Sequence, residues 1–240
     1  MLRTGIKIFG MLLVLLGVLS LAYPQISQIH FQYQADNMID KYKQWVAENQ
    51  GQEGQKEATA DNSLLEELYQ VMREYNEKIY VQKQDDLVDP FSYQQIDISL
   101  KAFGLPNEMI GHIEIPAIKV RMPIYLGAND ENMQKGAVHL TKTSYPIGGI
   151  NTNTVIAAHR GYAKAAMFRN IEQIAKEDRI IITNFREELI YQVTDITIIA
   201  PSEIDKVLIQ EGKDMVTLIT CHPYRQSYQR YVVYATRESK

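Results

Sequence analysis

Met215-Val216-Thr217-Leu218-Ile219-Thr220-Cys221 is a run of apolar and β-branched residues that ends in the only cysteine of the 240-residue chain. Such a run favours a buried strand. His222-Pro223 follows at once, and a proline cannot donate a backbone hydrogen bond to a strand ladder, so we expect the strand to stop near Cys221. The thiol should therefore emerge at the rim of a β-structure. A thiol in that position is reactive if its surroundings lower its pKa from about 8.5.

Two other polar residues occupy comparable positions. His159 closes the apolar run 154–158, and Arg230 opens the run 231–235. Taken singly, each of the three residues has a plain structural explanation, because cysteine is usually an inert small hydrophobe and histidine a satisfied structural group. Their placement at the edges of three strand-like segments, in the order His, Cys, Arg, indicates one shared site.

The segment Thr217-Leu218-Ile219-Thr220-Cys221 resembles the TLxTC signature of sortases, the transpeptidases of Gram-positive cell surfaces. Ala158-His159-Arg160-Gly161 resembles the histidine motif of that family, and Arg230 stands nine positions after Cys221, where the family places its arginine. Pro146-Ile147-Gly148-Gly149 lies upstream of the histidine, as it does in the family. The resemblance covers roughly residues 109–236.

The resemblance implies an acyl transfer in which Cys221 is the nucleophile. His159 would stabilise the thiolate as imidazolium and then protonate the leaving amine, while Arg230 would hold the developing oxyanion or the substrate backbone. Thr220 and His139 are the candidates for substrate binding or oxyanion support, although His139 in the strand-like run 138–140 also fits a structural role. The implied donor is an LPxTG-like sorting signal cleaved after its threonine, and the implied acceptor is an amine rather than water.

Other histidines and other chemistries fit the sequence less well. His222 adjoins Cys221, but neighbours along an extended chain point to opposite faces, so His222 should face away from the thiol. The chain has one cysteine, five scattered histidines and no His-Glu-x-x-His pattern, so we expect no metal and no cofactor. A net charge of −4 gives no reason to expect a nucleic-acid partner, since a phosphate-binding face normally needs a surplus of Lys and Arg.

The front of the chain is apolar. Residues 8–22 are almost uninterrupted hydrophobic sequence behind Arg3 and Lys7, which by the positive-inside rule leaves the N-terminus in the cytoplasm and exports the rest. Ser20-Leu21-Ala22 could also be a cleavage site, so a removed signal peptide is the alternative. The resemblance favours an uncleaved anchor at residues 1–23, with the catalytic domain outside the membrane of a Gram-positive cell.

The rest of the chain divides into three parts. Residues 24–84 carry apolar residues at helical intervals and predict one or two helices. Residues 85–92 contain Asp89-Pro90-Phe91, which from composition alone is an acidic surface loop but is similar to the lid motif of class C, pilus-building sortases. We therefore predict a lid at Asp89, Pro90 and Phe91, followed by a catalytic domain at residues 93–240.

The catalytic domain should be mainly β. Short β-favouring runs recur with turn residues between them, which predicts a sandwich or closed barrel, and the resemblance implies an eight-stranded β-barrel. Short helices are expected at 131–135, 165–174 and 202–208. The expected strands are residues 110–115, 118–124, 137–140, 155–159, 179–183, 189–199, 216–221 and 231–236.

Three functions stay open at this point. The Asp-Pro-Phe segment favours a pilin polymerase, whose partners would be pilin subunits with sorting signals and the lysine amine of the next pilin. The chain ends in the polar Arg237-Glu238-Ser239-Lys240, whereas many class C sortases carry a second hydrophobic segment there, so a housekeeping sortase that joins surface proteins to a cell-wall precursor is the alternative. A membrane-tethered adhesive β-domain is the non-enzymatic alternative.

Overall fold

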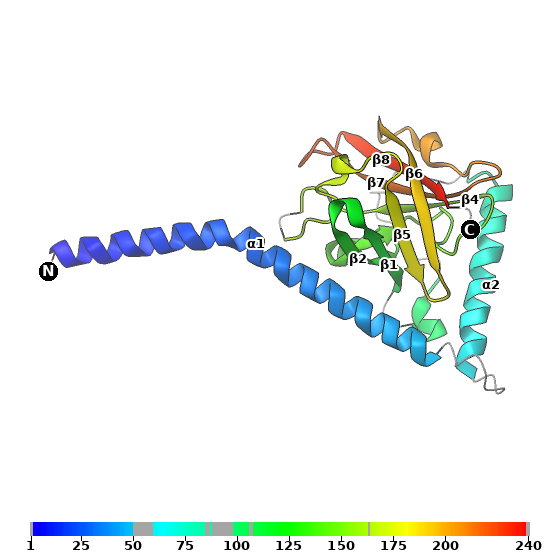
Figure 1. Ribbon diagram of the computed structural model, residues 1–240, viewed down its shortest axis with the longest axis horizontal. Coiled ribbons are helices and arrows are strands. Elements are labelled where there is room, and N and C mark those ends of the chain that lie inside the picture. Colours follow the sequence, from blue (N-terminus) through cyan, green and yellow to red (C-terminus); the bar gives the residue numbers. More distant parts are fainter. Residues whose placement is uncertain are drawn as a thin grey trace.

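The computed structural model describes residues 2–49, 60–84, 87, 98–105, 108–162 and 164–238. Its centre is a closed barrel of eight strands (Figure 1). This confirms the mainly β fold and all eight strands expected from the sequence. The strands are β1 (Met109–Ile115), β2 (Val120–Leu126), β3 (Ala137–His139), β4 (Thr152–Ala157), β5 (Arg179–Asn184), β6 (Glu188–Ile199), β7 (Asp214–His222) and β8 (Gln229–Arg237).

Strand order around the barrel differs from the order along the chain. The strands close in the sequence β1, β2, β3, β4, β7, β8, β6, β5. Two neighbouring pairs, β2 with β3 and β4 with β7, are parallel, and the others are antiparallel. Strands β4, β7 and β8 are thus adjacent in space although β5 and β6 lie between β4 and β7 in the chain.

The barrel strands contribute most of one continuous hydrophobic core. Ile113, Ile182, Leu218 and Val233 are among the side chains with no exposed surface. Each fully buried aliphatic side chain of this size contributes about 1.5–3 kcal/mol relative to an exposed one. The alternating apolar residues of the strands therefore supply the main stabilisation of the fold.

Only one of the three short helices expected from the sequence is an α-helix. It is α3 (Asp130–Lys135), capped by the Asn129 side chain, which accepts from the Asn132 N–H at 2.9 Å. The expected helices at 165–174 and 202–208 are reduced to the 3₁₀ turns η3 (Ile171–Gln173) and η4 (Ile204–Val207).

The backbone groups of these two segments bond elsewhere, which explains the shorter elements. The Phe168 N–H donates to the carbonyl of His159 at 3.0 Å, and the carbonyl of Val207 accepts from the Asn153 side chain at 2.9 Å. Contacts with His159, just past β4, and with Asn153 on β4 thus replace intrahelical bonds, an effect that local propensity does not reveal.

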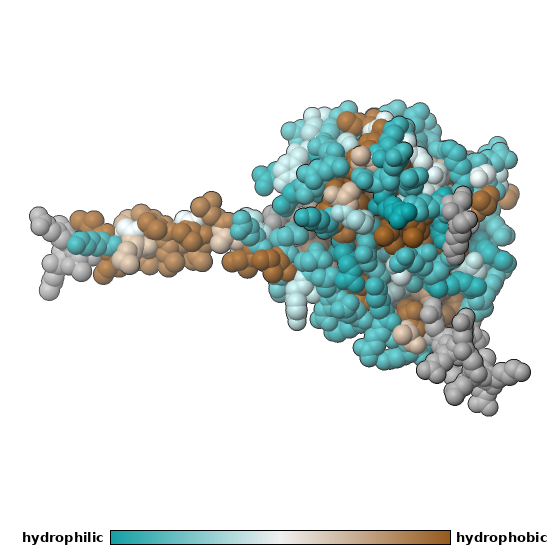
Figure 2. Space-filling view, in the orientation of Figure 1, coloured by the Kyte–Doolittle hydropathy of each residue, from teal (hydrophilic) through white to brown (hydrophobic). Residues whose placement is uncertain are grey.

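A single helix, α1 (Leu2–Asn49), precedes the barrel. We expected a membrane segment ending near residue 23 and a separate helix after it, but the helix continues through Pro24. It is long and apolar enough to cross a membrane. The large apolar side chains between residues 6 and 21 are exposed, and Figure 2 shows them as a hydrophobic rod that projects from the barrel.

The second half of α1 lies along β1 and β2 (Figure 1). Its buried Tyr42 hydroxyl donates to the carbonyl of Ile110 at 2.7 Å. Arg121 on β2 pairs with Asp36 of the helix at 2.6 Å and with Glu114 of β1 at 3.3 Å. The helix that carries the apolar rod is therefore fixed to the wall of the barrel.

A further helix, α2 (Ala60–Val81), packs on the barrel through Leu65, Leu68 and Met72, which are buried. Its Asn76 side chain accepts from the Tyr145 N–H at 2.7 Å and donates to the Tyr145 carbonyl at 3.3 Å. This two-point contact fixes α2 against the segment between β3 and β4.

Candidate active site

The strand register places the three residues singled out in the sequence side by side. Strands β4 and β7 run parallel with Ala157 opposite Ile219, so His159, two residues further on, comes level with Cys221. A bond from the Ala158 N–H to the Ile219 carbonyl, at 3.4 Å, continues this ladder past the last residue of β4. On the other side, Cys221 faces Arg230 across the antiparallel pair β7 and β8. The order across the sheet is therefore His159, Cys221, Arg230.

Cys221 lies where β7 leaves the core. The side chains from Met215 to Thr220 are buried, whereas Cys221 and His222 are partly exposed. The strand ends at His222, directly before Pro223, as the sequence predicts. The thiol is therefore held by a rigid strand and can be reached from solvent.

The ring of His159 stacks on Tyr162, with centroids 5.4 Å apart and planes 26° apart. Burial lowers the pKa of His159 below its usual 6.5, and the nearby charge of Asp130 acts in the opposite direction. A lowered pKa leaves the imidazole mostly neutral at pH 7. A neutral imidazole next to a thiol can accept its proton.

Arg230 is 5% exposed, so its charge is held in a site that excludes most water. Its Nη1 donates to the carbonyl of Ser227, just before β8, at 2.7 Å and to that of Gln229, the first residue of β8, at 3.1 Å. These bonds fix the orientation of the guanidinium beside Cys221. A cation fixed in this way can stabilise negative charge that develops on a substrate oxygen.

Thr220 bridges the strands that carry His159 and Cys221. The residue is fully buried, and its hydroxyl donates to the carbonyl of Ala158 at 2.6 Å. This bond positions the end of β4 against β7, a structural task for the Thr220 hydroxyl that the sequence did not indicate.

His139 is not brought to the other three residues. It is 2% exposed, its Nε2 lies 3.1 Å from the carbonyl of Ser144, and its ring stacks on Tyr145 at 5.1 Å. His139 pairs with Ile156 on β4, and Ile156 pairs with Leu218 on β7. Leu218 lies three residues before Cys221, so these side chains point to the opposite face of the sheet from the Cys221 thiol. His139 is a buried structural residue, and the structure does not support it as a substrate-binding one.

The connection between β6 and β7, residues 200–213, covers the face of the sheet that Cys221 shares with Thr217 and Ile219. The Thr217 hydroxyl donates to Asn153 at 2.8 Å, and the Asn153 amide reaches the carbonyl of Val207 at 2.9 Å. Tyr234 of β8 donates to the carbonyl of Lys206 at 2.9 Å. This connection therefore forms a wall beside the site. Sequence analysis missed it because most of these bonds end on backbone carbonyls, which carry no residue signature.

The predicted lid residues Asp89, Pro90 and Phe91 lie outside the described residues. Gln84, just before the predicted lid segment 85–92, is buried and joins the β3–β4 connection to the β6–β7 connection. Its amide donates to the carbonyl of Lys142 at 3.1 Å and accepts from the Ile209 N–H at 2.7 Å. The chain therefore approaches residues 85–92 from a fixed point on the β6–β7 connection.

The described residues include no group of three or more His, Cys, Asp or Glu side chains that could hold a metal ion. The arrangement offers a thiol, a neutral imidazole and a fixed guanidinium. Together they can form a covalent intermediate with a carbonyl compound, move a proton and stabilise an oxyanion.

Comparison with known proteins agrees with this arrangement. The family model for the sortase domain matches residues 113–238. The chain is 28% identical over 174 residues to sortase A of Bacillus anthracis, an alignment that covers 69% of this chain and 81% of the relative.

Solved structures give a finer comparison. Sortase C1 of Streptococcus agalactiae superposes with a TM-score of 0.72 at 34% identity, covering 84% of this chain and 98% of that one. Sortase C of Streptococcus pneumoniae superposes with a TM-score of 0.71 at 32% identity, covering 85% and 97%. The sortases to which this structure is most similar are those of class C.

A first prediction concerns Thr220. The change Thr220→Val removes the hydroxyl that donates to the Ala158 carbonyl and leaves that carbonyl without this bond in a buried site, so we expect the free energy of unfolding to fall by about 1–3 kcal/mol. Thr220→Ser keeps the hydroxyl and is the matched control. Urea denaturation of both variants measures the difference. A Val variant as stable as the wild type would contradict the structural role.

A second prediction concerns His139. Burial lowers its pKa to about 4, so the unfolded chain binds the proton more readily and acid favours unfolding. Its contribution to stability is present above pH 6.5 and is lost as the pH falls toward 4. Between pH 7 and pH 5 the loss should be about 2 kcal/mol. Urea denaturation at pH 7 and pH 5 gives the drop in unfolding free energy for each protein. The drop should be about 2 kcal/mol smaller in His139→Gln than in the wild type. An equal drop in the two proteins would contradict the low pKa of His139.

Proposed function

Because the chain belongs to the sortase family, we propose that it is a membrane-anchored cysteine transpeptidase that uses Cys221, His159 and Arg230. The observation that carries this proposal is the register of β4, β7 and β8, which aligns a thiol, an imidazole and a guanidinium across adjacent strands. Three such groups are what acyl transfer through a thioester requires.

In the first half of the reaction, Cys221 attacks the carbonyl carbon of the scissile amide and His159 takes the thiol proton. The carbonyl oxygen becomes an oxyanion, which the Arg230 guanidinium stabilises. As the C–N bond breaks, His159 returns the proton to the leaving amine, and the acyl group stays on Cys221 as a thioester. The neutral resting state of His159 suits it to accept the first proton.

In the second half, an acceptor amine attacks the thioester carbonyl. His159 now takes the proton of the amine, a new amide bond forms, and the C–S bond breaks to return the Cys221 thiolate. One amide has been exchanged for another with no net oxidation or hydrolysis. The imidazolium left on His159 then returns its proton to the thiolate, which restores the neutral thiol and imidazole for the next substrate.

We infer the substrate from the sortases to which this chain is similar. The structure of Streptococcus pneumoniae sortase C is reported to give insights into pilin substrate specificity, and a group B Streptococcus relative is described as pilus-related. These relatives and the Asp89-Pro90-Phe91 motif support an LPxTG-like sorting signal on a pilin as donor and a pilin lysine as acceptor. The match to sortase A of Bacillus anthracis favours the alternative, in which surface proteins are joined to a cell-wall precursor.

The lid belongs to the same proposal. Another solved relative is a lid mutant of Streptococcus agalactiae sortase C1, which is 31% identical to this chain. We propose that Asp89, Pro90 and Phe91 cover the site, with the carboxylate of Asp89 as a partner for a guanidinium and the Phe91 ring as an apolar contact. The fixed position of Gln84 on the β6–β7 connection supports this.

We also propose that α1 remains as a single-pass membrane anchor and holds the barrel on the outer face of the cell membrane. The exposed apolar side chains between residues 6 and 21 support the anchor, and Lys7 near its start supports a cytoplasmic N-terminus. The firm packing of the second half of α1 on β1 and β2 would then keep the barrel close to the membrane.

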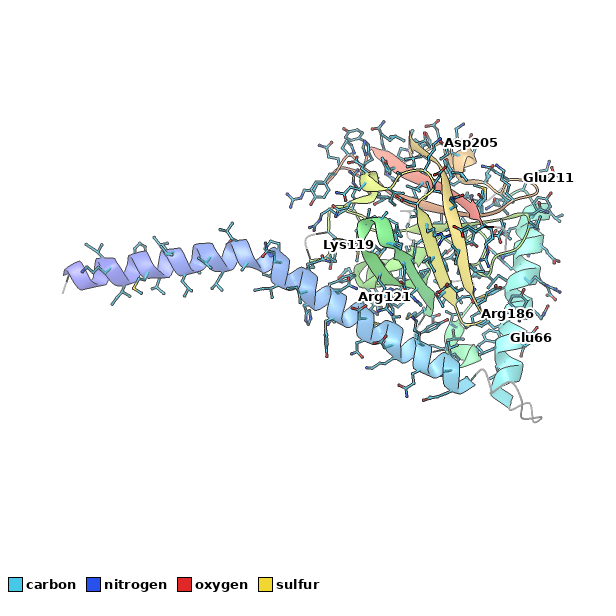
Figure 3. The ribbon with its side chains drawn as sticks, viewed as in Figure 1. Glu66, Lys119, Arg121, Arg186, Asp205 and Glu211 are labelled. Atoms are coloured by element: carbon cyan, nitrogen blue, oxygen red, sulfur yellow. The ribbon has the colours of Figure 1, made fainter. Side chains whose placement is uncertain are left out.

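The third prediction tests the three residues in one assay, the cleavage of a quenched fluorescent sorting-signal peptide in the presence of an amine acceptor. Cys221→Ala should abolish the reaction because no acyl-enzyme can form. His159→Ala and Arg230→Ala should each lower kcat/KM by about 100-fold or more. The control is Glu211→Gln. Glu211 is exposed and lies just before β7 begins, at the opposite end of that strand from Cys221 (Figure 3). Cleavage by Cys221→Ala at the wild-type rate would end the proposal.

The fourth prediction tests the anchor. The protein purified from the membrane fraction of the cells that make it should retain the apolar residues 6–22, because no cleavage is expected after Ala22. Intact-protein mass spectrometry reads the N-terminus directly. A mature chain that begins at Tyr23 would show a removed signal peptide instead.

A further inference from the structure

The three proposed catalytic residues are each followed in the sequence by a residue of one second cluster. Arg160 follows His159, His222 follows Cys221, and Tyr231 follows Arg230. The Nη1 of Arg160 lies 2.8 Å from Nδ1 of His222. The Tyr231 ring centroid lies 5.8 Å from the Arg160 guanidinium carbon and 5.8 Å from the His222 ring centroid.

A carboxylate completes this cluster. Glu172 on η3 accepts from Nη2 of Arg160 at 2.7 Å, and its other oxygen lies 3.4 Å from Nδ1 of His222. We call Arg160, Glu172, His222 and Tyr231 the Arg160 cluster. It joins the residues next to His159 and Cys221 through one guanidinium, without using either catalytic side chain.

We propose that the Arg160 cluster is a positioning device that holds the ends of β4 and β7 in the register at which His159 meets Cys221. The inference rests on the proposed function, since it assigns a task within that reaction. Arg160 acts through its neighbours and does not itself contact the substrate.

The geometry of Arg160 fits positioning better than general stabilisation. Arg160 is 3% exposed, and its Nε is buried with no hydrogen-bond partner among the described residues. Burying a guanidinium with one donor unsatisfied costs free energy, which a well-packed apolar side chain would not. The arginine instead provides two contacts from one planar group. From just past the end of β4, its guanidinium contacts His222 on β7 and Glu172 on η3 at the same time.

The contact with His222 also constrains its ring. An arginine can only donate hydrogen bonds, so Nδ1 of His222 must accept and its proton must lie on Nε2. The ring is then fixed on the side of the sheet away from the thiol, as strand alternation predicts. A shift of the His222 backbone would move Cys221, its direct neighbour, and misplace the thiol.

A second arginine–glutamate pair offers a matched control. Arg186 binds Glu66 at 2.7 Å, and its guanidinium carbon lies 4.0 Å from the Tyr69 ring centroid, so it has a carboxylate and a tyrosine ring as partners, as Arg160 does, but at an exposed position. This pair joins α2 to the turn between β5 and β6 (Figure 3). The last residue of β6, Ile199, pairs with Arg230, so Arg186 lies before the opposite end of that strand. Loss of the exposed Arg186 pair should lower stability slightly and loss of the buried Arg160 pair should lower it more, but only loss of the Arg160 pair should affect the reaction.

The fifth prediction compares Arg160→Gln with Arg186→Gln in the full-length protein. Arg160→Gln should lower kcat about 10- to 100-fold with KM changed less than about twofold, because a misplacement of about 1 Å has an effect of this size. The midpoint of the pH profile for alkylation of Cys221 by iodoacetamide should also rise, since the imidazole no longer lies against the thiol. Arg186→Gln should leave both readouts at wild-type values.

Glu172→Gln provides a second route if Arg160→Gln does not fold. The Glu172 side chain is 49% exposed, so the change is tolerated at a surface position, keeps an acceptor for Arg160 and should produce a smaller shift in the same direction. Wild-type kcat and an unshifted alkylation profile in a folded Arg160 or Glu172 variant would overturn the inference, as would equal losses in Arg186→Gln. The alkylation profile needs no substrate, so it separates failure of this inference from failure of the proposed transpeptidase activity, which Cys221→Ala tests.

Discussion

The parallel pairing of β4 with β7 is the constraint on which the site depends. Parallel neighbours end at the same edge of a sheet, so the residue after β4 and the last residues of β7 meet there. A slip of one residue would bring His159 level with Thr220 or His222 and turn it to the wrong face relative to Cys221. Buried side-chain bonds oppose such a slip, because Thr217 bonds to Asn153 and Thr220 to the Ala158 carbonyl.

The site also receives contacts from the helix that precedes the barrel. The Ser27 hydroxyl of α1 donates to the carbonyl of Lys164, and the side-chain carbonyl of Gln28 accepts from the Ala166 N–H. Both partners belong to the segment that follows His159 and carries Tyr162, the ring stacked on His159. The part of α1 that follows the apolar rod is therefore joined by direct contacts to the loop after His159. On the proposed function, the helix that anchors the enzyme also supports its general base.

The sequence predicted the features that local chemistry determines. Alternating apolar residues located all eight strands, and Pro223 marked the end of β7. It could not predict which strands pair, because the partners β4 and β7 are separated by two other strands. The interior position of His139 depends on the pairing of β3 with β4, and the short turns within 165–174 and 202–208 depend on bonds to the carbonyl of His159 and to the side chain of Asn153. Arg160 carried no signal beyond its place after His159, and its partner Glu172 lies in a part of the chain with no motif.

The most direct test of the account is the mass of the protein after mixing with a sorting-signal peptide and quenching in acid. The account predicts an adduct equal to the mass of the peptide up to its scissile bond, located on Cys221 by peptide mapping and released by hydroxylamine, as a thioester would be. The adduct should disappear when an amine acceptor is added before the quench. A protein that cleaves the peptide with no adduct, or with an adduct on another residue, would contradict the claim that the β4, β7 and β8 register builds a thioester-forming site.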